Sequence, residues 1–179
     1  LIAEARALRA LTYYHVVDLF GNASFVSENS VVGANPRYIK RAELFNYVVE
    51  EGNELLEGND LPEAGQAGYA RLDKSFVRMV LAKMYLNAEV YTKTEENPKG
   101  TAMWEEAKAT CEKIYALGYK IAPTYAELFR GDNGQNPDAL KELIFTADYD
   151  SENTRSYGGT TYLLFASLSA DEVSSSSMP

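Results

Sequence analysis

Residues 148–159 bring together side chains suited to binding a polyhydroxylated ligand. The stretch reads Asp-Tyr-Asp-Ser-Glu-Asn-Thr-Arg-Ser-Tyr-Gly-Gly. Sugars are held by aromatic rings that stack on their apolar C–H faces, and by Asn, Asp, Arg and Tyr side chains that hydrogen-bond their hydroxyls. Such binding needs neither a metal ion nor an acid with a shifted pKa. The stretch is therefore a candidate ligand-binding loop.

Tyr157 is the first candidate ligand-binding residue in this loop. It precedes Gly158 and Gly159, which allow the backbone to turn sharply and leave the ring exposed. Asn153 and Arg155 are the candidates for hydrogen bonds to hydroxyl groups. The alternative is that Tyr157 packs the loop onto the rest of the fold, and the sequence leaves both interpretations open.

Other motifs for chemistry are weak. We interpret His15, flanked by tyrosines and valines, as a hydrogen-bonded helix residue and not as a ligand or base. Asp132, Gly134, Asn136 and Asp138 alternate as in a calcium loop, but no bidentate Glu follows at the required distance. Nothing pairs two carboxylates as in a glycosidase, and the motifs of phosphate-binding loops and nucleophile elbows are missing. We expect no catalytic residue, no metal and no cofactor.

The composition limits the classes of partner. The chain has 179 residues, a formal net charge of −9 and 46% hydrophobic residues, enough for a folded core. Because binding to a nucleic-acid backbone depends on clustered Lys and Arg, this acidic balance argues against a nucleic-acid partner. The single cysteine excludes an internal disulfide framework. The 13 tyrosines suit either a helical core or a wet binding surface.

Hydrophobic periodicity predicts four long helices. They cover residues 3–19, 42–57, a stretch from an Asp73 N-cap to Tyr91, and 103–117. Leu8 and Leu19 widen the apolar stripe of the first helix, which predicts burial on more than one side. Trp104 and Cys111 share one stripe of the fourth helix, which predicts that both lie in the core.

The connections predict how the helices pair. The polar turn at 92–102 joins the third and fourth helices into an antiparallel hairpin, and the first two helices form a candidate second hairpin. Residues 22–40 read as a long loop with a short extended piece around Phe25 and Val26. Beyond Gly118 we expect a short helix that Thr124 caps, a loop at 131–138 and a strand at 143–146. These features predict a mainly α fold of tetratricopeptide-like helical hairpins with a long loop insertion and a few short strands.

Several segments together resemble the SusD/RagB family of Bacteroidetes outer-membrane nutrient-binding lipoproteins. The opening AEARALRALTYY (3–14), followed by DLFGN (18–22), resembles the signature segment of that family. Further segments follow in the order of the family: KMYLNA (83–88), WEEA (104–107), GYKI (118–121), YAELF (125–129) and ELIF (142–145). Ala7 departs from the pattern, because the family usually has a bulky aromatic residue there.

The resemblance implies a cell-surface binding protein and not an enzyme. Family members sit on the outer face of the outer membrane, cap a SusC-like TonB-dependent transporter and bind oligosaccharides for import. They are lipid-anchored through an N-terminal cysteine, and Cys111, in the middle of a helix, does not match it. We expect residues 1–179 to be a fragment of one SusD-like domain, with a helical scaffold over 1–130 and a loop-rich ligand-facing part over 131–179.

Two other functions stay open from the sequence. One is a helical-repeat scaffold that contacts proteins and has no small-molecule ligand of its own. The other is a hydrolase that uses carboxylates without a recognisable motif.

Overall fold

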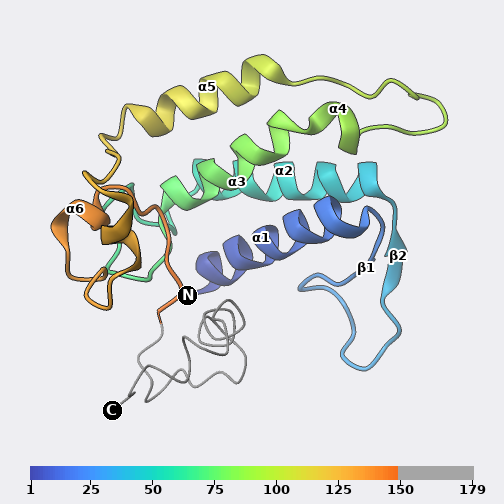
Figure 1. Cartoon of the computed structure of the whole chain (residues 1–179). Helices are drawn as coiled ribbons and strands as arrows, with labels where there is room; N and C mark the ends of the chain where they lie inside the picture. Colours follow the sequence, from blue (N-terminus) through green and yellow to red (C-terminus); the bar gives the residue numbers. More distant parts are fainter. Residues whose placement is uncertain (149–179) are drawn as a thin grey trace, which may run out of the picture. The chain divides into compact units, whose positions relative to one another are not determined.

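The computed structural model describes residues 1–148 of the chain. Residues Leu1–Thr146 form one compact unit, which is mostly helical (Figure 1). Its elements, in chain order, are α1 (Ile2–Phe20), β1 (Ala23–Phe25), β2 (Arg37–Ile39), α2 (Arg41–Glu57), α3 (Lys74–Leu86), α4 (Ala88–Tyr91), α5 (Trp104–Tyr115), the 3₁₀ helix η1 (Tyr125–Phe129) and α6 (Pro137–Leu140). The predicted mainly α fold with a few short strands is confirmed.

Helix α1 packs one face against α2 and α3 (Figure 1). That face is rich in small residues, with Ala7 and Ala10 buried beside Val17. Leu8 and Leu19 are exposed, so the prediction that they widen the buried stripe is wrong. The reason is that the neighbouring helices cover α1 from one side only. Gly21 ends the helix, with a φ of 75° that favours glycine.

Helices α2 and α3 approach each other closely at Gly52. A Cβ atom on this glycine would lie 2.8 Å from a methyl carbon of Leu81, so only a residue without a side chain fits there. The buried stripe of α3 runs from Val77 through Leu81 to Met84, as its spacing predicts. Asn87 interrupts the predicted helix, and its last turn forms the separate helix α4.

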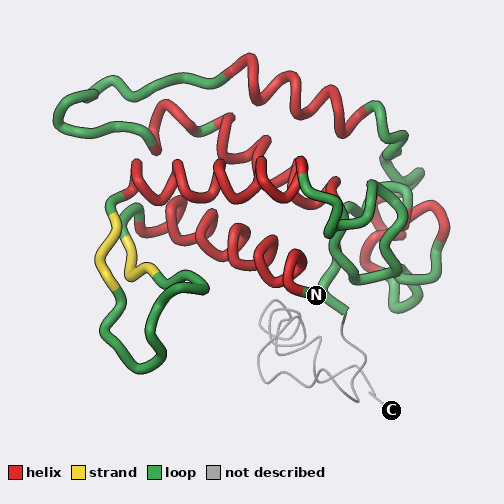
Figure 2. The backbone as a smooth tube through the Cα atoms, turned by 180° about the vertical axis from the view of Figure 1, so that it is seen from behind, coloured by secondary structure: helices red, strands yellow, loops and turns green. Residues whose placement is uncertain are grey.

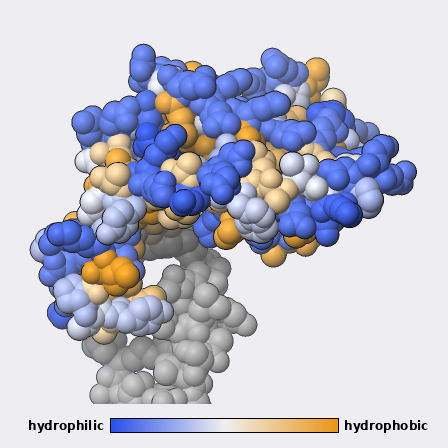
Figure 3. Space-filling model, turned by 90° about the horizontal axis from the view of Figure 1, so that it is seen from above, coloured by the Kyte–Doolittle hydropathy of each residue, from blue (hydrophilic) through white to orange (hydrophobic). Residues whose placement is uncertain are grey.

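Helix α5 packs on α3, which confirms the predicted helical hairpin. Ala107 and Ile114 are buried, but Trp104 is 54% exposed and Cys111 is exposed as well. The prediction that Trp104 and Cys111 lie in the core is therefore wrong. Because α5 is the outermost helix, only a narrow stripe is covered by its neighbour (Figure 1), and the surface seen from that side is largely hydrophilic (Figure 3).

The extended piece predicted around Phe25 belongs to a two-stranded antiparallel sheet (Figure 2). β1 pairs with β2 so that Ala23 lies opposite Ile39 and Phe25 opposite Arg37. The Tyr13 hydroxyl fastens the end of β1 to α1, because it accepts from the Val26 amide (2.8 Å) and donates to its carbonyl (2.9 Å). The loop between α1 and α2 is thus a hairpin anchored on a core tyrosine.

The segment after α5 has less regular structure than the sequence predicts. The expected short helix is present as η1, but the Thr124 side chain makes no capping hydrogen bond. The expected strand at 143–146 does not form. A backbone hydrogen bond from Lys120 N to Lys141 O (3.0 Å) joins residues 119–121 to the segment just before the expected strand. Phe145 instead packs edge-on against Phe76, with 5.0 Å between ring centroids. This segment therefore packs a side chain against α3 and does not pair as a strand.

Within residues 1–148, no helix is long and apolar enough to cross a membrane.

Candidate functional site

The three predicted ligand-binding residues, Tyr157, Arg155 and Asn153, lie outside the described residues. Their roles stay predictions. The chain reaches their loop through Leu143–Thr146, and these residues line a cavity of about 330 Å³ in the described unit. The cavity is the nearest described site to the candidate loop along the chain.

The loop that precedes α3 also lines this cavity. It contributes Tyr69, a residue that is 45% exposed, and Tyr119 contributes a second tyrosine to the cavity. Gly134 packs so closely on Tyr69 that a Cβ there would lie 2.8 Å from the hydroxyl. The close contact fixes the Tyr69 ring from one side, while much of the ring stays open to solvent.

Hydrogen bonds to Asp73 hold the loop before α3 in place. Its carboxylate caps α3 by accepting from Ser75 N (2.8 Å), and it also accepts from Gly65 N (2.7 Å). The Ser75 hydroxyl bonds the same carboxylate, and the Tyr119 hydroxyl donates to Ser75 Oγ (2.7 Å). Because its oxygens are occupied in this way, Asp73 holds the loop and Tyr119 in place and is not set up as a general base.

Arg71 lines the same cavity, but its guanidinium is engaged in an ion pair outside it. Its guanidinium makes a bidentate ion pair with Glu4 of α1, at 2.7 Å for each contact. The hydrogen bonds from Arg71 lower the pKa of Glu4 to about 2. This pair ties the cavity lining to α1, so the cavity offers a ligand mainly aromatic and aliphatic side chains, the Thr146 side chain and backbone groups.

The arginines of the opening segment build a second ion-pair cluster. Glu51 of α2, whose side chain is 6% exposed, accepts from Arg6 Nε (2.8 Å) and Arg9 Nη2 (2.9 Å). Burial alone would raise the pKa of Glu51, but the two guanidinium groups more than offset burial and lower it. The sequence analysis assigned no role to Arg6 and Arg9. Their spacing of three residues, which places both on one face of α1, was the available signal.

The described residues offer no metal centre. Within 1–148, no group of three His, Cys, Asp or Glu side chains is close enough to hold an ion. In the loop with calcium-like spacing, Asp132 pairs with Arg130 (3.2 Å) and Asp138 pairs with Lys141 (2.8 Å). Both carboxylates are therefore engaged with basic side chains. His15 is exposed and touches the Tyr14 ring, with 5.0 Å between centroids.

Comparison with known proteins identifies the family of this chain. No family model matches it. It is 38% identical over 162 residues to the starch-binding protein SusD of Bacteroides thetaiotaomicron, an alignment that covers 90% of this chain and 27% of that protein. The chain belongs to the SusD family. A SusD-like protein of Bacteroides ovatus is 26% identical over 143 residues, with 78% of this chain and 25% of that protein covered. The SusD-family chain thus spans about a quarter of the length of the curated relatives it matches.

Solved structures agree with the SusD fold. A SusD-like protein of Bacteroides fragilis superposes with a TM-score of 0.62 at 20% identity, over 84% of this chain and 27% of the other. Surface glycan-binding protein A of Bacteroides uniformis gives a TM-score of 0.61 at 20% identity, over 82% of this chain and 30% of the other. A SusD-like carbohydrate-binding protein of Bacteroides fragilis gives 0.53 at 26% identity, over 71% and 23%.

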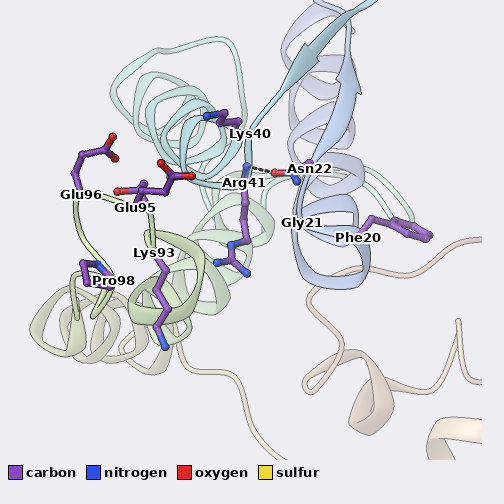
Figure 4. A pocket seen from close by; sticks show the side chains of 11 residues that line it. Phe20, Gly21, Asn22, Lys40, Arg41, Lys93, Glu95, Glu96 and Pro98 are labelled. Carbon is purple, nitrogen blue, oxygen red and sulfur yellow. Dashed lines mark hydrogen bonds between the residues drawn. The ribbon is translucent and has the colours of Figure 1, made fainter.

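The SusD-family chain has a larger cavity at the other end of its helices. It measures about 690 Å³ and lies between the end of α1, the start of α2 and residues 93–98 after α4 (Figure 4). Lys40, Arg41 and Lys93 line it, together with Glu95 and Glu96. The Arg41 backbone amide donates to the Asn22 side chain (2.9 Å), which joins the two helix ends at this cavity. No local sequence pattern indicates this cavity, because its residues come from three separate segments.

Proposed function

We propose that this chain is part of a protein that binds oligosaccharides at the cell surface. The observation that carries the proposal is the 38% identity, over 162 residues, to a starch-binding protein of the same family. The solved relatives that share the fold include proteins named as glycan-binding and carbohydrate-binding. The tyrosine-lined cavity agrees with this function, because aromatic walls with few free charges suit sugar rings.

In this proposal, Tyr157 stacks on a sugar ring while Asn153 and Arg155 hydrogen-bond its hydroxyls. Independently of this loop, Tyr69 is an exposed aromatic residue within the described unit that could stack on a sugar. The protein holds its ligand by shape and hydrogen bonds and carries out no reaction. The commitment of Asp73 and Glu4 to structural partners supports a binding role over a hydrolytic one.

We also propose where the protein is located and how its ligand is delivered. The bound oligosaccharide passes to a SusC-like TonB-dependent transporter, and the protein is lipid-anchored on the outer face of the outer membrane. Delivery needs only that the states of the complex that hold and release ligand differ in affinity, since a ligand shifts a conformational equilibrium by that difference.

Titration calorimetry against a panel of soluble oligosaccharides, starch fragments first, tests the binding function. We expect heat with at least one glycan, and we expect Tyr157→Ala to abolish it while Tyr38→Ala, which changes an exposed tyrosine of the β hairpin, keeps it. Absence of heat with every glycan overturns the proposal. Unchanged binding by Tyr157→Ala removes the role of Tyr157 alone.

The exposed face of α5 supports a second candidate function, a protein-contact scaffold. Trp104 and Tyr115 are exposed on this outermost helix, and tryptophan and tyrosine are enriched at protein interfaces. A scaffold predicts that a partner protein co-purifies with the chain in the absence of sugar, and that Trp104→Ala releases the partner while Tyr157→Ala does not. Retention of the partner by Trp104→Ala contradicts this function.

A further inference from the structure

The 690 Å³ cavity concentrates positive charge that has no ion-pair partner in the described part of the chain. Arg6, Arg9, Arg37, Arg71 and Arg130 each contact a carboxylate. By contrast, no carboxylate of residues 1–148 lies within 4.0 Å of the charged groups of Lys40, Arg41 or Lys93. The Arg41 Nε atom is shielded from solvent and has no hydrogen-bond partner there. A buried donor without an acceptor is costly, so an acceptor supplied by a ligand would be favourable.

The position of two of these cations works against the local structure. Lys40 is the N-cap of α2 and Arg41 is its first residue, and the Lys40 side chain makes no capping hydrogen bond. The N-terminal end of a helix carries partial positive charge, so cations there destabilise it. Glu43, the acidic residue of the first turn, pairs with Arg37 (2.7 Å). Conflict between a local preference and the residues present is typical of a site kept for function.

Glu95 and Glu96 also line the cavity, but they do not neutralise Arg41 and Lys93. In Figure 4 the Arg41 and Lys93 side chains both extend away from the two carboxylates, which lie on the side of Lys40. The backbone amide of Glu96, the Thr94 hydroxyl and the charge of Lys40 lower the pKa of the Glu96 carboxyl. Arg41 and Lys93 therefore line the cavity without a carboxylate of residues 1–148 within 4.0 Å of their charged groups.

We propose that Arg41 and Lys93 bind carboxylate or sulfate groups of an acidic oligosaccharide. The inference rests on the proposed glycan-binding function and names a ligand class for a site separate from the tyrosine-lined cavity. A guanidinium makes strong, directional hydrogen bonds to carboxylate and sulfate oxygens, and the lysine adds a second positive charge. A volume of about 690 Å³ is within the usual range of small-molecule sites, so the cavity has room for sugar rings beside the charged group.

A comparison of acidic and neutral oligosaccharides tests this inference. Oligogalacturonate and a sulfated oligosaccharide serve as acidic probes, maltoheptaose as the neutral probe and free acetate as the control for the bare anion. We expect the acidic oligosaccharides to bind, and we expect Arg41→Gln with Lys93→Gln to weaken them at least about tenfold, the effect of losing charge-assisted hydrogen bonds. Raising NaCl from about 0.01 M to about 1 M should weaken acidic binding strongly, because salt shortens the range of charge interactions.

Matched controls separate a binding role from a structural one. Lys99→Gln removes a cation from the same loop that does not line the cavity, and it should leave binding unchanged. Removing the Arg41 charge from the start of α2 should leave the melting temperature equal or higher, whereas a structural role for Arg41 predicts a decrease.

The outcomes distinguish this inference from the proposed function. If the wild-type chain binds maltoheptaose but neither acidic oligosaccharide, or if the double variant binds the acidic probes as well as wild type, the inference fails and the proposed function stands. Binding of acetate as tight as that of the acidic oligosaccharides also overturns it, because the sugar then contributes nothing. Failure of every glycan to bind overturns the proposed function first.

Discussion

Gly52 of α2 lies directly against Leu81 of α3, and three side-chain carbons of Leu81 are within 3.2 Å of the place where a Cβ on Gly52 would stand. Leu81 is almost fully buried, so it has little room to withdraw. The sequence analysed alone makes Gly52 a weak point of its helix, since glycine costs about 1 kcal/mol relative to alanine in a helix. The packing makes it the residue that allows the two helices to meet.

Gly52→Ala should therefore destabilise the fold despite its better helix propensity. Overpacking a filled core costs about 1–3 kcal/mol, against a propensity gain of about 0.5–1 kcal/mol, so we expect a net loss in the free energy of unfolding. Urea unfolding followed by circular dichroism measures this. In a Leu81→Ala background the same change should stabilise, because the space is then free. A Gly52→Ala chain more stable than wild type would show that Leu81 is not confined.

Glu51 should be the most sensitive acidic residue of the helical unit. Glu51→Gln removes the buried carboxylate that Arg6 and Arg9 share, and it leaves each arginine with an exposed partner, Glu54 for Arg6 and Glu28 for Arg9. Losing one partner of a buried ion pair costs about 3–5 kcal/mol, and we expect about 2 kcal/mol here because both arginines remain partly exposed. The control is Glu54→Gln, an exposed partner of Arg6, which should change stability by about 0.5 kcal/mol or less. Equal effects of the two substitutions contradict the prediction.

The Glu4–Arg71 pair should make stability depend on pH in the acid range. The pKa of Glu4 is lowered to about 2 in the folded chain from 4.5, so the folded state favours the ionised carboxylate. Its stabilising contribution is complete above the unfolded pKa and is lost as the pH falls toward about 2.

Melting temperatures of wild type and Glu4→Gln, measured from neutral pH down to acid, test this pH dependence. The wild type should be more stable at neutral pH, and the difference should shrink below the pH that matches the unfolded pKa of 4.5. Glu43→Gln removes a pair that is exposed on both sides and should show a smaller difference throughout. A difference between wild type and Glu4→Gln that is constant with pH excludes the ion pair as its source.

Tyr13→Phe should loosen the β hairpin without unfolding the helices. The change removes the hydroxyl that bonds both the amide and the carbonyl of Val26. Leaving these backbone groups without their partner costs about 1–3 kcal/mol. Amide hydrogen exchange should speed up at Val26 more than within α3. Tyr38→Phe, at an exposed site on β2, should leave the exchange rates unchanged, and equal acceleration by both variants would contradict an anchoring role.

Local sequence signals determined most of the helices. The spacing of Val77, Leu81 and Met84 placed one apolar face on α3, and Asp73 fixed where that helix begins. These signals work because helix periodicity and capping involve residues only a few positions apart. The family resemblance, too, was readable from short ordered segments, and the comparison with a 38% identical relative confirmed it.

Tertiary packing decided what local patterns leave open. Trp104 and Cys111 lie on an apolar stripe, yet both are exposed, since α3 is the helix of residues 1–148 that packs closely on α5. Residues 143–146 have strand-like composition but pair with no strand within residues 1–148. The compensation of Arg6 and Arg9 by Glu51 depends on how α1 meets α2. Arg41 and Lys93 line one cavity because the fold brings together segments that are far apart in the chain. Periodicity can say which face of a helix is apolar, but only the assembled fold determines which faces and charges find a partner.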